Sequence, residues 1–221
     1  VMSHEIRTPL NGVLGVAALM ERELTQTSLR PYVRTILDSG ASLLRLLTDA
    51  LDMSRAEAGI LALEPAPLDL DAVAADLSAL WRPRAEEKAL RLSVTTDTAA
   101  ARWVVGDEMR LKQLLNNLIG NALKFTQVGA VEVSLTTRLD DGRVRLDAVV
   151  DDSGPGVSEE AAVAIFEPFN TGEAGRQGAG AGLGLAICRQ IVERMEGRLA
   201  LERSPAGGAR FRFDLHLPLA E

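Results

Sequence analysis

The sequence predicts an α+β protein in two parts: a helical hairpin that joins a second copy in a dimeric four-helix bundle, and then a sandwich of helices packed on one face of a sheet. Three observations carry this prediction. Residues 1–60 repeat apolar side chains at spacings of three and four and show no strand-like alternation. Two prolines within residues 63–67 interrupt that repeat. From residue 68 onward, helical stretches and alternating strands occur without the strict alternation of a parallel α/β fold.

The first 60 residues contain two amphipathic helices. The apolar stripe of the first helix consists of Ile6, Leu10, Val13, Ala17, Met20 and Leu24. The second helix follows Ser28, and its stripe consists of Ile36, Gly40, Leu43, Leu47, Ala50 and Ser54. Two helices alone cannot enclose such stripes, so we expect a homodimer joined through residues 1–62.

The segment Leu63-Glu64-Pro65-Ala66-Pro67 separates the two parts. Each proline lacks an amide donor and restricts the residue before it, so a helix cannot continue through this segment. We therefore predict a dimerisation domain at 1–62, a linker at 63–67 and a second domain at 68–221.

The second domain mixes helical and strand patterns. We expect helices at 71–89, 107–125 and 183–195, and strands at 91–95 and 211–217. Apolar and polar residues also alternate over 131–135 and again over 144–148, with Asp141-Gly142 between them. That arrangement predicts a β-hairpin.

Composition and charge exclude several classes of protein. The 221 residues suit two domains, at about 100–200 residues per domain. The net charge of -7 argues against a nucleic-acid partner. A single cysteine, Cys188, excludes a disulfide framework and a zinc cluster and fits a reducing compartment. No apolar run approaches the roughly 20 residues of a membrane span. The chain begins at Val1 and shows no signal peptide, so we expect a cytoplasmic fragment of a longer protein, with or without a membrane anchor elsewhere.

One histidine lies on the polar side of the first helix. At about 100° per residue, His4 lies about 200° from the apolar Ile6 and faces solvent, on the same side as Thr8. The carboxylate of the adjacent Glu5 suits a hydrogen bond to one ring nitrogen, which raises the nucleophilicity of the other. For a lone histidine, ordinary solvation on a polar helix face would be the preferred interpretation, so the functional one depends on the surrounding motif.

The helix at 107–125 carries a second polar face. Asn117, Asn121 and Lys124 follow one another at i, i+4 and i+7, opposite a run of leucines. Amide oxygens are hard ligands that suit Mg²⁺, and a lysine one turn away supplies a point charge for phosphate. We therefore expect Asn117 and Asn121 to hold a metal ion and Lys124 to contact phosphate.

Two glycine-rich segments follow. Asp152 comes directly after a strand and is followed by Gly154 and Gly156, a pattern that suits either a plain turn or a carboxylate that accepts from the exocyclic amine of adenine. Residues 178–184 alternate glycine with alanine and leucine at the start of a helix, which predicts a phosphate cradle of free backbone amides. No parallel βαβ unit surrounds this loop, so a dinucleotide-binding interpretation fails.

One stretch resembles the phosphoacceptor box of sensor histidine kinases: Ser3-His4-Glu5-Ile6-Arg7-Thr8-Pro9-Leu10-Asn11-Gly12. Its residue sequence is similar to that of hybrid kinases. The resemblance implies that His4 is phosphorylated and that Glu5 assists. It also implies that Thr8 positions the water that dephosphorylates a partner.

The rest of the chain is similar to the ATPase domain of the same family. Four segments carry this resemblance, those of the N, G1, F and G2 boxes, at 110–126, 152–156, 166–169 and 178–187. It implies the Bergerat fold, an α/β sandwich shared with type II topoisomerases, MutL and heat-shock chaperone ATPases, with ATP and Mg²⁺ as cofactors. The implied nucleotide-binding residues are Asn117, Asn121, Lys124, Asp152, Gly154, Gly156, Gly180, Gly182, Leu183 and Gly184, of which Asn117 and Asn121 hold the metal. Residues between about 170 and 180 correspond to a short lid. Two residues depart from the family's usual pattern: Asn170, just after the F box, and Ala181, which replaces the threonine of the usual Gly-Thr-Gly.

The implied function is ATP-dependent phosphorylation of His4, followed by transfer to an aspartate on a response-regulator receiver domain, in cis or in trans. Because His4 and the nucleotide site belong to different domains, we expect bending of the linker to control their approach. Two alternatives remain: a protein that acts mainly as a phosphatase of its response regulator, and a nucleotide-binding regulator without catalysis.

Overall fold

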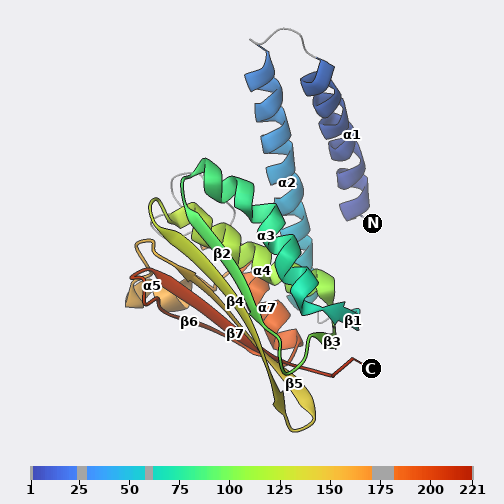
Figure 1. Ribbon diagram of the computed structural model, residues 1–221. Coiled ribbons are helices and arrows are strands. Elements are labelled where there is room, and N and C mark those ends of the chain that lie inside the picture. The colour runs from blue at the N-terminus through green and yellow to red at the C-terminus, as the bar shows by residue number, and fades with distance from the viewer. Residues whose placement is uncertain (1, 24–28, 58–61, 171–181, 221) are drawn as a thin grey trace.

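A computed structural model describes residues 2–23, 29–57, 62–170 and 182–220 of the chain. Figure 1 shows a long helical hairpin that projects from a layered domain of one sheet and several helices. The helical first part and the mixed second part are both confirmed. Within the described residues, no helix is long and apolar enough to cross a membrane.

The hairpin consists of α1 (Met2–Glu23) and α2 (Arg30–Glu57), which pack side by side in opposite directions. The helices come close at Gly40, where an added Cβ would collide with the side chain of Leu14. Ala17 and Val33 are buried between them. Several large apolar side chains of the hairpin stay exposed in the single chain: Val13, Val16, Leu19, Met20, Leu29, Tyr32, Ile36 and Leu43.

A short two-stranded sheet opens the second domain. β1 (Ala66–Asp69) pairs antiparallel with β3 (Trp103–Gly106). β1 therefore begins at Ala66, inside the stretch that the sequence analysis assigned to the linker. Pro67 is tolerated because β1 has a partner on one side only.

The main sheet has five strands in the order β2-β4-β5-β7-β6. β2 runs parallel to β4, and all other neighbours are antiparallel. The strands span β2 (Arg91–Asp97), β4 (Ala130–Asp140), β5 (Arg143–Asp152), β6 (Arg198–Arg203) and β7 (Ala209–Leu217). Asp141 and Gly142 both have positive φ angles, as a two-residue hairpin turn requires, which confirms the predicted hairpin of β4 and β5.

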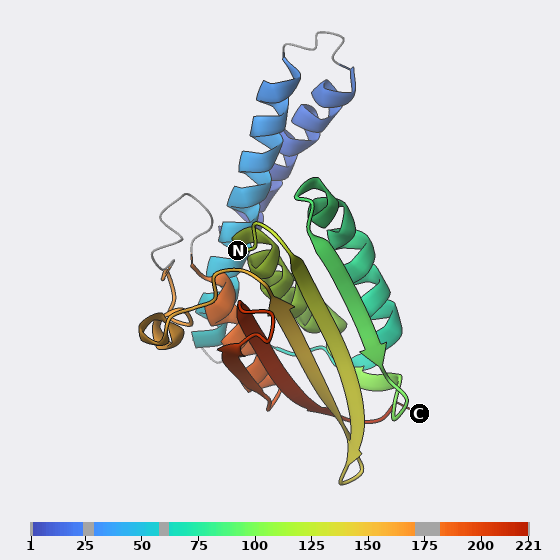
Figure 2. The same ribbon diagram turned by 60° about the vertical axis from the view of Figure 1, so that its left-hand side comes forward.

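Helices cover one face of this sheet, as predicted (Figure 2). They are α3 (Leu70–Glu87), α4 (Glu108–Phe125) and α7 (Gly184–Arg194), with the short α5 (Glu159–Ala164) following β5. The opposite face carries cross-strand ion pairs, among them Arg210–Asp151 at 2.7 Å and Arg212–Asp147 at 3.0 Å.

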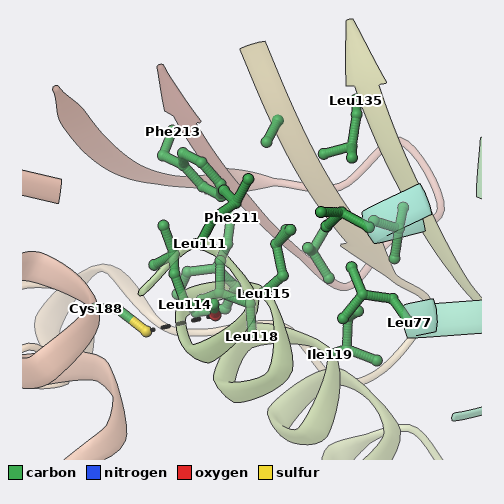
Figure 3. Close-up of a cluster of buried hydrophobic side chains, with 14 of the residues drawn as sticks. Leu77, Leu111, Leu114, Leu115, Leu118, Ile119, Leu135, Cys188, Phe211 and Phe213 are labelled. Carbon is green, nitrogen blue, oxygen red and sulfur yellow. Dashed lines mark hydrogen bonds between the residues drawn. The ribbon is translucent and has the colours of Figure 1, made fainter. Parts of the chain in front are cut away.

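α4 supplies the centre of the core (Figure 3). Its fully buried residues Leu111, Leu114, Leu115, Leu118 and Ile119 face the sheet, toward Phe211 and Phe213. Burial of each such side chain contributes about 1.5–3 kcal/mol. Cys188 of α7 is also fully buried, and burial raises the pKa of its thiol to about 12, so it acts as a packing residue.

Candidate functional site

Both ends of α4 are capped, so this helix is a rigid support for the polar residues on its other side. Asp107 accepts a hydrogen bond from the amide of Arg110 at 2.9 Å and thereby caps the first turn. At the other end, the Lys88 ammonium donates to the carbonyls of Leu123, Lys124 (3.3 Å) and Thr126 (3.4 Å). A cation at this position satisfies carbonyls that the helix itself leaves unpaired.

The three predicted polar residues of α4 lie on the side of the helix away from its buried leucines. Asn117, Asn121 and Lys124 are all half-buried, while the apolar side of the helix is fully buried. Partial burial lowers the pKa of the Lys124 ammonium, and its Nζ lies 4.4 Å from the centre of the Phe125 ring.

Asn117 also contacts the start of α7. Its Nδ2 donates to the Gly184 carbonyl at 3.5 Å, and a Cβ added to Gly184 would lie 3.6 Å from the Asn117 Oδ1. The structure therefore brings together the asparagine face and the helix that follows the glycine-rich loop.

The N-terminus of α7 fits the predicted phosphate cradle. Leu183 occupies the N-cap position and supplies no side-chain hydrogen bond, so the first amides of α7 have no side-chain cap. Gly182 has a φ of 72°, and a Cβ there would lie 2.6 Å from the Asn170 carbonyl oxygen, so only glycine fits. Gly180, Ala181 and most of the predicted lid lie outside the described residues.

Asp152 ends β5 as a buried carboxylate, 6% exposed. Its Oδ1 accepts from the amides of Gly154 at 2.8 Å and Ala209 at 3.2 Å. Burial raises the pKa of this carboxyl group above its ordinary value, and the two amide hydrogen bonds only partly offset that effect.

Glycines surround this carboxylate. A Cβ on Gly154 would lie 3.0 Å from the Asp152 Oδ1, and one on Gly208 would collide with the same oxygen. Gly156, with a φ of 76°, lies against the Gly208 carbonyl. The backbone can therefore reach the carboxylate closely from two segments far apart in the sequence.

A polar cluster that the sequence analysis missed joins α2 to α4. The Arg110 Nη1 lies 2.8 Å from the Asp52 Oδ2, and the Gln113 Nε2 donates to the same oxygen at 2.9 Å. Asp52 and Arg110 come from different predicted domains, 58 residues apart, so no local pattern could have paired them. Nearby, the second oxygen of Asp107 accepts from the amide of Glu64 at 2.9 Å and holds the linker to the first turn of α4.

The predicted phosphoacceptor residues His4, Glu5 and Thr8 all lie within α1. The structure describes their backbone but not their side chains. Leu14 and Gly40 meet across the hairpin, and His4 and Ala50 each lie ten residues, about 15 Å, from that contact in the same direction. His4 is therefore at about the level of Asp52, where α2 contacts the second domain.

No cluster of three or more His, Cys, Asp or Glu side chains occurs in the part of the chain that the structure describes. The fold and site together indicate a nucleotide-binding domain joined to a helical hairpin whose first helix carries the histidine motif.

Comparisons with known proteins identify the family. Residues 106–221 match the histidine kinase-, DNA gyrase B- and HSP90-like ATPases, and residues 1–59 match the His Kinase A (phospho-acceptor) domain. The chain therefore belongs to the sensor histidine kinases, of which it holds the phosphoacceptor and ATPase domains. This confirms the resemblance and the fold class predicted from the sequence.

Two curated relatives are hybrid-type sensor kinases. The chain is 38% identical over its full length to the autoinducer 2 sensor kinase/phosphatase LuxQ of Vibrio cholerae, of which it covers 26%. It is 36% identical over 99% of its length to the signal transduction histidine-protein kinase BarA of Escherichia coli, of which it covers 24%. The chain thus spans about a quarter of the length of these relatives.

A solved structure shows the same arrangement. The chain matches full-length ShkA in complex with AMPPNP with a TM-score of 0.77 and 38% identity, over 99% of this chain and 45% of that one.

Proposed function

We propose that this chain binds ATP with Mg²⁺ and transfers the γ-phosphoryl group to His4. The observation that carries the proposal is the buried carboxylate of Asp152. Both of its hydrogen bonds go to Oδ1, and no described residue bonds to Oδ2. The Oδ2 atom is therefore the acceptor for the 6-amino group of adenine, beside the side-chain-free backbone of Gly154 and Gly208.

The phosphates would then lie between α4 and the start of α7. The uncapped amides behind Leu183 donate to phosphate oxygens, and Lys124 adds positive charge. The side-chain oxygens of Asn117 and Asn121 would hold Mg²⁺, which neutralises charge on the phosphates. The contact of Asn117 with Gly184 supports this arrangement, because it links the metal face to the phosphate cradle.

Transfer to His4 needs little covalent chemistry from the rest of the protein. A ring nitrogen of His4 forms a bond to the γ-phosphorus as the bond to the bridging oxygen breaks, and ADP leaves. Glu5 accepts a hydrogen bond from the other ring nitrogen and removes its proton as the ring becomes cationic.

The phosphoryl group would pass on to an aspartate of a receiver domain, in cis or in trans. Two chains would join through residues 1–62, since the apolar surface of the hairpin exceeds what one chain covers.

A phosphatase activity toward the same receiver domain is the second candidate function. Thr8 in the motif of α1 supports it, as does the similarity of the chain to LuxQ, a sensor kinase/phosphatase.

Incubation with γ-labelled ATP and Mg²⁺ tests the proposal. We expect an acid-labile label on the wild-type chain and none on His4→Gln, which should bind ATP as the wild type does. Label that persists on the variant would show that another residue is the acceptor. A wild-type chain that binds ATP without labelling would favour a regulator without catalysis.

A further inference from the structure

One buried hydroxyl group in the second domain has no hydrogen-bond partner. Thr126, the residue after α4, is 0% exposed, and its Oγ1 makes no hydrogen bond with any residue that the structure describes. An unsatisfied buried polar group typically costs about 1–3 kcal/mol, so such a group calls for an explanation.

Two other buried or half-buried hydroxyls of this domain, those of Ser153 and Thr137, bond to backbone groups. The Ser153 Oγ accepts from the Ala130 amide at 2.9 Å and donates to the Val128 carbonyl at 3.2 Å. The Thr137 Oγ1 accepts from the Ala101 amide at 3.2 Å. Thr126 differs from both, because its Oγ1 has no such partner among the described residues.

The Thr126 hydroxyl faces the same glycine as the Asp152 carboxylate. A Cβ placed on Gly154 would lie 3.3 Å from the Thr126 Oγ1 and 3.0 Å from the Asp152 Oδ1. A hydroxyl that can donate therefore lies beside a carboxylate that can only accept. This pair matches the edges of adenine, where the 6-amino donor is flanked by ring nitrogens that accept.

The backbone of Thr126 is already satisfied, which leaves only the side chain for a ligand. Its amide donates to the Ala122 carbonyl, and its carbonyl accepts from the Lys88 ammonium at 3.4 Å. Threonine is also stiff at χ1, so the hydroxyl loses little rotamer entropy on binding.

We propose that Thr126 is a second base-recognition residue. Its hydroxyl donates, directly or through one bound water, to a ring nitrogen of adenine next to the 6-amino group that Asp152 accepts. The proposal rests on the nucleotide site described above and adds a residue to it. Guanine would present a carbonyl oxygen in place of the amine, so the pair would also select adenine over guanine.

Two substitutions in the full 221-residue chain test this proposal. Thr126→Val keeps the shape and removes the hydroxyl, and Thr126→Ser keeps the hydroxyl. Without nucleotide, we expect Thr126→Val to have a melting temperature equal to or above that of the wild type, because no protein hydrogen bond is lost. We expect its Kd for ATP to rise about tenfold, as loss of one hydrogen bond to a buried site predicts, and the serine variant to stay near wild type. A clear loss of melting temperature in Thr126→Val without nucleotide, or an unchanged Kd, would overturn the proposal.

Modified nucleotides identify the contact on the base. The 1-deaza and 7-deaza analogues of ATP each replace one of the ring nitrogens by a C–H group. One of them should bind the wild type more weakly than ATP does, and that difference should disappear in Thr126→Val. Analogue penalties that are the same in both proteins would overturn the role of the hydroxyl. Failure of the wild type to bind ATP would instead contradict the proposed function, so the two failures are distinguishable.

Discussion

Asp52 of α2 and Arg110 of α4 form an ion pair of 2.8 Å that joins the helical hairpin to the ATPase domain. Their side chains are only 9% and 12% exposed, and Gln113 bonds to both. Charges this well buried are stabilising only while they are paired, so the cluster favours one placement of the two domains.

Removal of either partner should loosen that placement. We expect Asp52→Ala to increase the radius of gyration measured by small-angle X-ray scattering, because Arg110 is left buried without its anion. The charge-swapped pair Asp52→Arg with Arg110→Asp should restore the wild-type value. An unchanged radius of gyration in the single variant would mean that other contacts suffice to hold the two domains in place.

Loss of a metal ligand should be separable from loss of fold. Asn121→Ala is expected to abolish autophosphorylation with little change in melting temperature, because the residue is half-buried on the polar face of α4. Asn116→Ala is the matched control on the same helix, since the Asn116 Oδ1 accepts from the Trp81 Nε1 at 2.7 Å. That variant should lose stability, by about 1 kcal/mol or more, and keep its activity. If Asn116→Ala instead abolished autophosphorylation and Asn121→Ala kept it, the metal ligand would be Asn116 and not Asn121.

The two predicted roles beside His4 should give different defects. Glu5→Gln should slow autophosphorylation by about 10²–10⁴-fold, as the loss of a general base does. Thr8→Ala should mainly slow dephosphorylation of a phosphorylated receiver domain. The test is to measure the rates of autophosphorylation and of receiver dephosphorylation in both variants. Equal losses of the two activities in each variant would contradict the separate roles of Glu5 and Thr8.

Burial of Asp152 predicts a pH effect with a definite sign. Its pKa is raised in the folded state, so the folded protein binds this proton more tightly than the unfolded chain does. Above the folded pKa, the ionised Asp152 carboxylate therefore lowers the free energy of unfolding. This loss of stability is relieved as the pH falls through that pKa. We expect Asp152→Asn to unfold at pH 7 no more easily than the wild type, to lose this pH dependence, and to lose ATP binding. Asp151→Asn, which breaks the pair with Arg210 on the other face of the sheet, should weaken the fold and keep ATP binding.

The exposed apolar side of the hairpin predicts a dimer that charge disrupts. Leu43 is 53% exposed on α2, and Leu47 lies one turn further. Replacement of both by Asp should convert dimers to monomers in size-exclusion chromatography with light scattering, while nucleotide binding persists. Leu139, 64% exposed at the tip of the β4–β5 hairpin, is the control, because Leu139→Asp should leave the dimer intact. A wild-type monomer at tens of micromolar, about the range of weak dimer affinities, would contradict the prediction.

Periodicity was sufficient to predict the elements that carry the site. The leucines of α4 repeat at helical spacing and are buried, which leaves Asn117 and Asn121 on the other side, as predicted. The β4–β5 hairpin followed from alternation and from a turn that needs positive φ angles. β1 and β3, of four residues each, are too short for alternation to mark them, and α5 has only six residues.

Contacts between distant segments were not predictable in this way. The pairing of Asp52 with Arg110 depends on where two helices meet in space. Likewise, the environment of Thr126 is set by Gly154, 28 positions further along the chain and on the other side of the β4–β5 hairpin. Sequence motifs identified the residue types of the site, but only packing shows which polar atoms lack partners.

The two oxygens of Asp107 have a mechanical consequence. One caps α4 and the other accepts from the Glu64 amide, so the linker is attached at the first turn of the helix that carries Asn117 and Asn121. Asn117 lies ten residues further along α4, about 15 Å from this anchor. Over that distance, a tilt of α4 by about 10° about Asp107 moves Asn117 by about 3 Å relative to the hairpin. A small rotation at the Asp107 carboxylate would therefore move the proposed phosphate site by about the distance that separates two reacting atoms before a bond forms.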